Sequence, residues 1–133
     1  NAERCHALER MRFICGDLFE PLGEPARFDA IVCNPPYVRT ADLVGLDEEV
    51  RDFEPHLALD GGEDGLAFYR RIAAPASLLL EAAGGLFLEV GDGQADSVSG
   101  LLEQSGKYEG IEVLPDLASV PRVVCGRRRT GLE

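Results

Sequence analysis

Four consecutive residues, Asn34, Pro35, Pro36 and Tyr37, are the stretch of this sequence best suited to chemistry. Proline has no backbone N–H and a fixed φ, and it forces the preceding residue into an extended conformation. The Asn34 side-chain oxygen and the Pro35 carbonyl are therefore two acceptors on a stiff backbone, suited to the two N–H donors of a planar NH2 group. The ring of Tyr37 offers a flat surface against which that group can lie.

An amide nitrogen is the kind of group that such a turn would activate. It is a poor nucleophile, because its lone pair is delocalised into the carbonyl. Acceptors that hold its hydrogens and fix its plane would help it attack an electrophile in line, through orientation and electrostatic stabilisation rather than a strong base. The alternative is a rigid turn that only ends a strand, since proline commonly interrupts regular structure.

Two short apolar runs predict strands that would position this turn. "MRFIC", residues 11–15, stops at Gly16-Asp17, and "FDAIVC", residues 28–33, stops at Asn34. We predict both as strands buried on two faces. Ligands of a parallel α/β sheet bind beyond the carboxyl ends of its strands, so Asp17 and the turn are expected to line one crevice.

A helix and a strand are predicted in the middle of the chain. From Leu66 to residue 83, apolar positions recur at three- and four-residue steps, with Asp64 placed to cap the start and Gly84 to end the helix. The strand "GGLFLEVG", residues 84–91, follows. Between the turn and this helix, residues 39–64 are polar and predict a long loop region with a weakly helical patch.

The last third of the sequence predicts a reversal of strand direction. An amphipathic helix runs from Ala95 to Gly106, and the strands "GIEVL", residues 110–114, and "RVVCG", residues 122–126, follow it. The segment between these strands is too short for a helical crossover, so they should be antiparallel. The prediction is an α/β fold with a mostly parallel sheet and an antiparallel last strand at its edge.

Composition excludes several classes of protein. The chain has 133 residues and a formal net charge of -11, which would repel phosphate backbones and disfavours a nucleic-acid substrate. Its four cysteines show no metal-ligand spacing, and we predict mostly buried, reduced thiols and a cytoplasmic protein. No apolar run has the length of a membrane span, and we expect no signal peptide. "DGGEDG", residues 60–65, lacks the spacing of a calcium loop, and no metal site is predicted.

Both ends of the sequence have the features of a fragment. "NAERCHALER" opens the chain as the tail of a helix that has no start signal, and Leu132-Glu133 resembles a cloning remnant. We therefore expect residues 1–131 to form part of one catalytic domain whose first strands are missing.

Several segments together carry a family resemblance. "NPPY" after a buried strand resembles the signature of S-adenosylmethionine-dependent methyltransferases that act on exocyclic or amide nitrogens. "GDLFEPL", "FDAIVCNPPYV", "EVRDFEPHLALDGGEDGLAFYRRI", "GGLFLEVG" and "RVVCGRR" together are similar to the HemK/PrmC-type protein-glutamine methyltransferases. Those enzymes methylate the side-chain amide of the Gly-Gly-Gln motif in peptide chain release factors.

This resemblance implies a fold and a set of site residues. The family has a Rossmann-like methyltransferase fold, a seven-stranded sheet with a reversed last strand. Asn34, Pro35, Pro36 and Tyr37 would be the catalytic residues that bind the substrate glutamine amide, with Asn34 also near the methyl donor. Asp17 and Leu18 match positions that line the adenine of S-adenosyl-L-methionine.

The resemblance also identifies what the chain lacks. Family members bind the cofactor with a glycine-rich loop after the first strand and an acidic residue after the second, and neither precedes "NAERC" here. We expect this chain alone to bind the cofactor weakly or not at all.

Two other functions stay open from the sequence. The first is methylation of a nucleic-acid amino group of the adenine N6 type. The second is a catalytically incomplete, partner-dependent module, because missing first strands would leave an exposed sheet edge that invites self-association.

Overall fold

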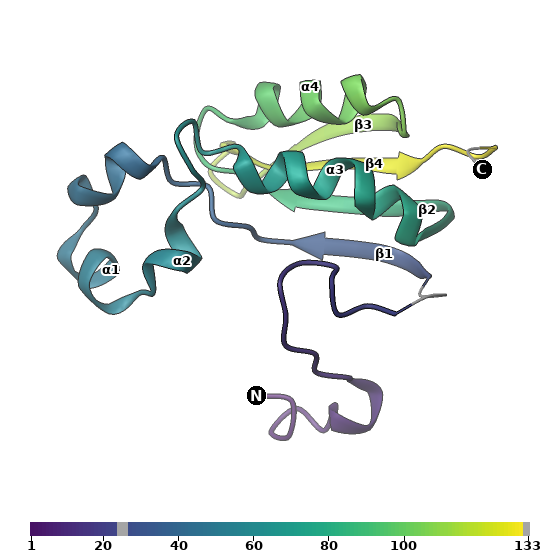
Figure 1. Ribbon diagram of the computed structural model, residues 1–133, viewed down its shortest axis with the longest axis horizontal. Helices are drawn as coiled ribbons and strands as arrows, with labels where there is room; N and C mark the ends of the chain where they lie inside the picture. The colour runs from purple at the N-terminus through teal and green to yellow at the C-terminus, as the bar shows by residue number, and fades with distance from the viewer. Residues whose placement is uncertain (24–26, 132–133) are drawn as a thin grey trace.

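A four-stranded sheet forms the centre of the protein, as the computed structural model shows for residues 1–23 and 27–131 (Figure 1). Its strands are β1 (Phe28–Cys33), β2 (Leu80–Glu89), β3 (Tyr108–Pro115) and β4 (Pro121–Arg128), in the order β1-β2-β4-β3. β1 pairs with β2 in parallel, whereas β4 is antiparallel to both of its neighbours. Three strands therefore run in one direction and the last strand runs against them, as the sequence predicted.

Two helices cover one face of the sheet, α3 (Ala67–Leu79) and α4 (Ala95–Ser105) (Figure 1). Their apolar positions recur every three or four residues, so each helix presents one apolar stripe to the strands. α4 ends where Gly106 takes a left-handed conformation with φ 65°, which glycine adopts without steric cost. This end was predicted.

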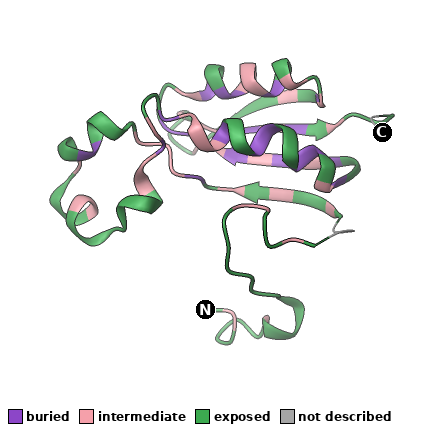
Figure 2. Cartoon of the chain, in the orientation of Figure 1, coloured by how far each residue is buried: buried purple, intermediate pink, exposed green. Residues whose placement is uncertain are grey.

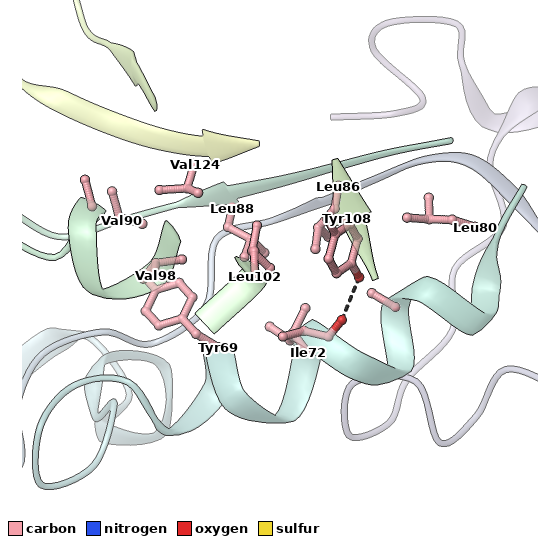
Figure 3. Close-up of a cluster of buried hydrophobic side chains, with 13 residues drawn as sticks. Tyr69, Ile72, Leu80, Leu86, Leu88, Val90, Val98, Leu102, Tyr108 and Val124 are labelled. Carbon is pink, nitrogen blue, oxygen red and sulfur yellow. Dashed lines mark hydrogen bonds between the residues drawn. The ribbon is translucent and has the colours of Figure 1, made fainter. Parts of the chain in front are cut away.

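The space between these helices and the sheet is the hydrophobic core (Figure 3). Leu86 and Leu88 of β2 and Val124 of β4 are fully buried against the helices. Burying a side chain of this size stabilises the fold by about 1.5–3 kcal/mol. The hydroxyl of Tyr108 donates to the Ala73 carbonyl of α3 at 2.6 Å, which satisfies the only polar atom of that buried side chain.

The opposite face of the sheet is open. Side chains alternate along a strand, so Val32 of β1, Phe87 of β2 and Cys125 of β4, which are register partners, point away from the helices. Val32 is 79% exposed. The prediction that residues 28–33 are buried on two faces is therefore wrong for one face, because the helices of the described residues cover only the other.

The N-terminal segment differs from its prediction. A 3-10 helix, η1 (Leu8–Arg10), follows a set of turns, and residues 11–15 form no strand. Phe13 is 69% exposed, and Figure 2 shows exposed residues along most of this segment. A strand needs a neighbour for its backbone hydrogen bonds, and β1 pairs only with β2 in the part of the chain that the structure describes.

An arm of short helices connects the end of β1 to α3 and projects away from the sheet (Figure 1). It contains a 3-10 helix, η2 (Thr40–Gly45), and the helices α1 (Glu48–Phe53) and α2 (His56–Leu59). The sequence predicted a polar loop with one weakly helical patch here. The structure has three short helices in its place, η2, α1 and α2.

Three further predictions need correction. Helix α3 stops at Leu79, whereas the predicted helix continued to residue 83. Leu80 and residues 81–84 belong to β2. The end of the helix was misplaced because apolar residues at helical spacing continue from the helix into the strand. The antiparallel strand β4 lies between β2 and β3 and is not at an edge. The cysteines are not mostly buried: Cys5 and Cys15 are exposed, and the other two are half-buried.

Within residues 1–23 and 27–131, no helix combines the length and apolarity needed to cross a membrane.

Candidate active site

The Asn34–Tyr37 turn begins directly after β1, on the side of the sheet where β1 and β2 both end (Figure 1). Pro35 is buried and Asn34 is exposed. Among the described residues, no hydrogen bond reaches the Asn34 side chain or the Pro35 carbonyl. The two predicted acceptors therefore have no hydrogen-bond partner in this part of the chain, on a backbone that the prolines hold stiff.

The two ends of the arm run side by side next to this turn. Val38 forms a parallel bridge with Asp60: the Val38 N–H donates to the Leu59 carbonyl at 3.0 Å, and the Gly61 N–H donates to the Val38 carbonyl at 2.7 Å. A Cβ on Gly61 would lie 2.7 Å from the Tyr37 Cα, closer than real Cβ contacts allow. Glycine at 61 is thus required by the close approach of the two backbones.

The carboxylate of Asp60 secures this pair of segments. Its Oδ1 accepts the Thr40 hydroxyl at 2.7 Å and the Gly62 N–H at 2.9 Å. These two hydrogen bonds, first that from Thr40, lower the pKa of Asp60 below its ordinary value, because they favour the ionised form.

Gln94, which the sequence analysis did not select, contacts the turn from the loop after β2. Its Nε2 donates to the Tyr37 carbonyl at 3.0 Å and to the Gly65 carbonyl at 3.4 Å. Its Oε1 accepts the Gly91 N–H at 3.0 Å. The sequence shows only "GDGQ", residues 91–94, a glutamine at the start of a helix. This pattern is too common to predict a contact between Gln94 and Tyr37, which are 57 residues apart.

A hollow of about 410 Å³ opens beside the turn. Its lining includes Tyr37, Arg39, Asp64, Asp92, Gln94 and Ser97. The Arg70 guanidinium and the Leu66 N–H lower the pKa of the Asp64 carboxyl to about 2, so Asp64 is ionised at neutral pH. Asp64 was predicted to cap α3, but its carboxylate accepts the N–H of Leu66, which itself precedes the first residue of the helix.

Asp17 and Leu18, the predicted cofactor residues, lie on a separate loop. The Asp17 carboxylate accepts from the Arg71 guanidinium of α3 at 2.7 Å, and both side chains are about half exposed. Leu18 has φ 47° and packs against the core. No hydrogen bond of the described residues joins this loop to the turn, although Leu18 and Tyr37 pack against the same buried cluster.

These groups can be tested against the chemistry of the predicted cofactor. Asn34 fits a role beside a methyl donor, because its side chain is exposed and makes no other hydrogen bond in the described part of the chain. Asp17 would share its carboxylate between a ligand and Arg71. No group of three or more His, Cys, Asp or Glu residues that could bind a metal ion occurs among residues 1–23 and 27–131.

Comparisons with known proteins identify close relatives. No family model matches the chain. It is 49% identical over 127 residues to a release factor glutamine methyltransferase of Geobacter sulfurreducens, which covers 96% of this chain and 43% of the relative. A release factor glutamine methyltransferase of Thermodesulfovibrio yellowstonii is 43% identical over 117 residues, covering 88% of this chain and 41% of the relative. The chain thus spans less than half the length of these curated relatives.

A solved structure is also similar. The crystal structure of a release factor-specific protein-(glutamine-N5) methyltransferase from Alicyclobacillus acidocaldarius aligns with a TM-score of 0.50 and 31% sequence identity, over 77% of this chain and 50% of that one. The predicted resemblance and the predicted fold class are confirmed. The roles of the individual site residues stay predictions.

Proposed function

We propose that this chain, which is similar over nearly its whole length to release factor glutamine methyltransferases, is the carboxyl-terminal part of the catalytic domain of such an enzyme. The intact enzyme transfers a methyl group from S-adenosyl-L-methionine to the side-chain amide nitrogen of the glutamine in the Gly-Gly-Gln motif of peptide chain release factors.

The Asn34–Tyr37 turn binds and orients the substrate amide in this reaction. The Asn34 Oδ1 and the Pro35 carbonyl accept the two N–H groups of the substrate amide, and the Tyr37 ring lies against its plane. These contacts fix the direction of the nitrogen lone pair and stabilise the positive charge that develops on the nitrogen during attack. The cofactor supplies an electrophilic methyl group on a positively charged sulfur. The nitrogen–carbon bond would form as the sulfur–carbon bond breaks, the sulfur would leave as a neutral thioether, and the methylated nitrogen would lose one proton.

One observation carries the proposal. The turn holds two acceptors without hydrogen-bond partners among the described residues, on a backbone that two prolines stiffen and a buried Pro35 anchors. A turn that served only to end a strand would have no need to keep both acceptors without hydrogen-bond partners. The sequence similarity gives this chemistry its substrate class.

Asp17 and Leu18 contribute to the cofactor site in this proposal. They form only a small part of it, and the chain alone is expected to bind S-adenosylmethionine weakly or not at all. A calorimetric titration of the chain with the cofactor tests this, and tight binding would contradict it.

The proposed reaction is tested with the complete gene product that contains this chain. The protein is incubated with methyl-labelled S-adenosylmethionine and, in separate reactions, a release factor, the same factor with its Gly-Gly-Gln glutamine changed to alanine, and DNA. We expect label in the unmodified factor only. Label in DNA alone would establish the adenine-type activity instead, which the acidic charge of the chain disfavours.

The exposed edge of the sheet favours a second candidate, a module that depends on a partner or a second copy. Among residues 1–23 and 27–131, β1 pairs with β2 only, so its other edge is unpaired there. Edge strands pair readily with other chains. The mass of the chain in solution distinguishes the candidates, because a monomer with a cooperative thermal transition would contradict the partner-dependent module.

A further inference from the structure

We propose that Gln94 is a positioning residue for the reaction: it fixes the carboxyl end of the Asn34–Tyr37 turn and thereby aims the two substrate acceptors. The inference rests on the function proposed above and extends it to a residue outside the turn, on a different loop.

The evidence begins with the hydrogen bonds of the Gln94 amide. In the described part of the chain this amide makes three hydrogen bonds, all to backbone groups: the carbonyls of Tyr37 and Gly65 and the N–H of Gly91. These groups come from three segments that are far apart in sequence: the turn, the start of α3 and the loop after β2. One side chain therefore ties together the three backbone segments that surround the hollow.

Two glycines keep the space that Gln94 occupies. A Cβ on Gly65 would lie 2.5 Å from both the Tyr37 carbonyl oxygen and the Gln94 Nε2. A Cβ on Gly91 would lie 2.8 Å from the Gln94 Oε1 and 2.8 Å from the Tyr37 ring. A side chain at either position would displace Gln94 or the turn. The contact between Gln94 and Tyr37 therefore depends on a glycine in each of two separate loops.

The chemistry of the contact suits an amide. The carbonyls of Tyr37 and Gly65 need hydrogen-bond donors, and the Gly91 N–H needs an acceptor. A planar amide carries both a donor NH2 group and an acceptor oxygen, so it can satisfy all three. An ionised glutamate has two acceptors and would place a negative charge beside two carbonyl oxygens. Asparagine is shorter by one methylene. Gln94 is also the N-cap of α4, yet its side chain makes no capping hydrogen bond, because it is used for these contacts instead.

The position of the Tyr37 carbonyl affects the substrate acceptors through the prolines. Pro35 and Pro36 have fixed φ angles, so the turn behaves as a stiff segment between β1 and its far end. β1 holds the near end through its pairing of Cys33 with Leu88. If the far end is released, the Pro35 carbonyl changes direction, and a misplacement of about 1 Å can cost about 100-fold in rate.

The test uses Gln94→Glu in the complete gene product, with Gln104→Glu as the matched control. Gln104 lies in α4, the helix that begins directly after Gln94, is exposed, and makes no side-chain hydrogen bond in the described part of the chain. We expect Gln94→Glu to lower kcat for release factor methylation by about 10- to 100-fold while KM for the release factor changes less than about threefold. Gln104→Glu should match the wild-type enzyme. A purely structural role would lower the amount of folded enzyme and leave the kcat of the folded fraction unchanged, and that result would overturn the inference.

A second measurement does not depend on activity. Amide hydrogen exchange at Val38, whose N–H donates to the Leu59 carbonyl, reports how firmly the far end of the turn is held. We expect exchange at Val38 to become at least about tenfold faster in Gln94→Glu and to stay unchanged in Gln104→Glu. Unchanged exchange in both variants would overturn the positioning role. Failure of the wild-type enzyme to methylate any release factor would instead overturn the proposed function, and hydrogen exchange would then decide the role of Gln94 by itself.

Discussion

The Asn34–Tyr37 turn and the Asp17–Leu18 loop were predicted to line the same site, and the structure holds them in very different ways. The turn is fixed by the β1 pairing, by the backbone bridge between Val38 and Asp60, and by Gln94. In the part of the chain that the structure describes, the loop has one charged contact, the ion pair of Asp17 with Arg71, and both of its members are about half exposed. Exposed ion pairs of this kind stabilise a fold by about 1 kcal/mol or less.

This difference matches the tasks that we assign to the two regions. An amide nitrogen reacts only when its plane is held in the correct direction, so the acceptors that hold it must be fixed before the substrate arrives. A loop that lines one side of a cofactor can take its final shape when the cofactor binds, because the binding energy contributes to the ordering. Changes in the turn should therefore affect the protein more than changes in the loop.

Removal of the first acceptor of the turn should have the largest effect. In the complete gene product, we expect Asn34→Ala to lower kcat for release factor methylation by about 100- to 1,000-fold, the magnitude seen when one group that stabilises a transition state is lost. Asn34→Asp keeps an acceptor oxygen and should retain more activity than Asn34→Ala. Equal losses in the two variants would show that the acceptor is not what Asn34 provides.

Crowding of the turn should reduce stability. Gly65 has φ 75° and no room for a Cβ beside Tyr37 and Gln94. We expect Gly65→Ala to lower the free energy of unfolding by about 2–4 kcal/mol, which combines left-handed strain and overpacking. Gly93 has a similar φ of 74° but an added Cβ there would meet nothing within 4 Å, so Gly93→Ala is a matched control that isolates the strain. Denaturant unfolding measures both, and equal losses would contradict the close packing at Gly65.

Loss of the ion pair on the other loop should leave stability nearly unchanged. We expect Asp17→Asn to change the free energy of unfolding by less than about 0.5 kcal/mol, because the pair with Arg71 is exposed. In the complete gene product it should weaken S-adenosylmethionine binding, measured by calorimetry. Arg71→Gln removes the same pair without touching the proposed cofactor contact. If Arg71→Gln weakens cofactor binding as much as Asp17→Asn does, the ion pair rather than the Asp17 carboxylate is responsible.

Acid should loosen the segment beside the turn at a pH lower than usual for a carboxylate. Hydrogen bonds from Thr40 and Gly62 lower the pKa of Asp60, so the stabilisation that its carboxylate gives is complete above pH 3.8 and is lost as the pH falls through the lower pKa of the folded state. The Gly62 amide resonance should titrate with a midpoint below pH 3.8. Asp60→Asn should abolish this titration, and a midpoint at or above 3.8 would contradict the hydrogen bonds.

The sequence predicted β1 with the bounds that the structure has, predicted the elements of the second half of the chain well, and predicted the N-terminal segment poorly. Helix α4, strand β2 and the antiparallel pair β3–β4 were predicted, since each has a clear apolar period or run. The strand at residues 11–15 was wrong, because an apolar run forms a strand only beside another strand. The end of α3 was misplaced because apolar spacing continued from the helix into β2.

The sequence predicted the chemistry of the site but not the contacts that hold the Asn34–Tyr37 turn in place. Asn34, Pro35, Pro36 and Tyr37 stand out because paired prolines after a strand fix a backbone locally, and the local sequence alone determines that stiffness. Gln94, Gly61 and Gly65 could not be selected, because their importance comes from atoms that approach them from distant segments.

The sequence by itself determined the rigid pair of acceptors, the acidic charge and the reversed last strand, since these follow from residue types and from the length of one connection. Only the tertiary structure decided that β4 lies between β2 and β3, that one face of the sheet is open, and that the amide of Gln94 reaches the turn. Strand order and contacts between loops depend on which buried surfaces meet, and that choice is made by the packing of the whole chain.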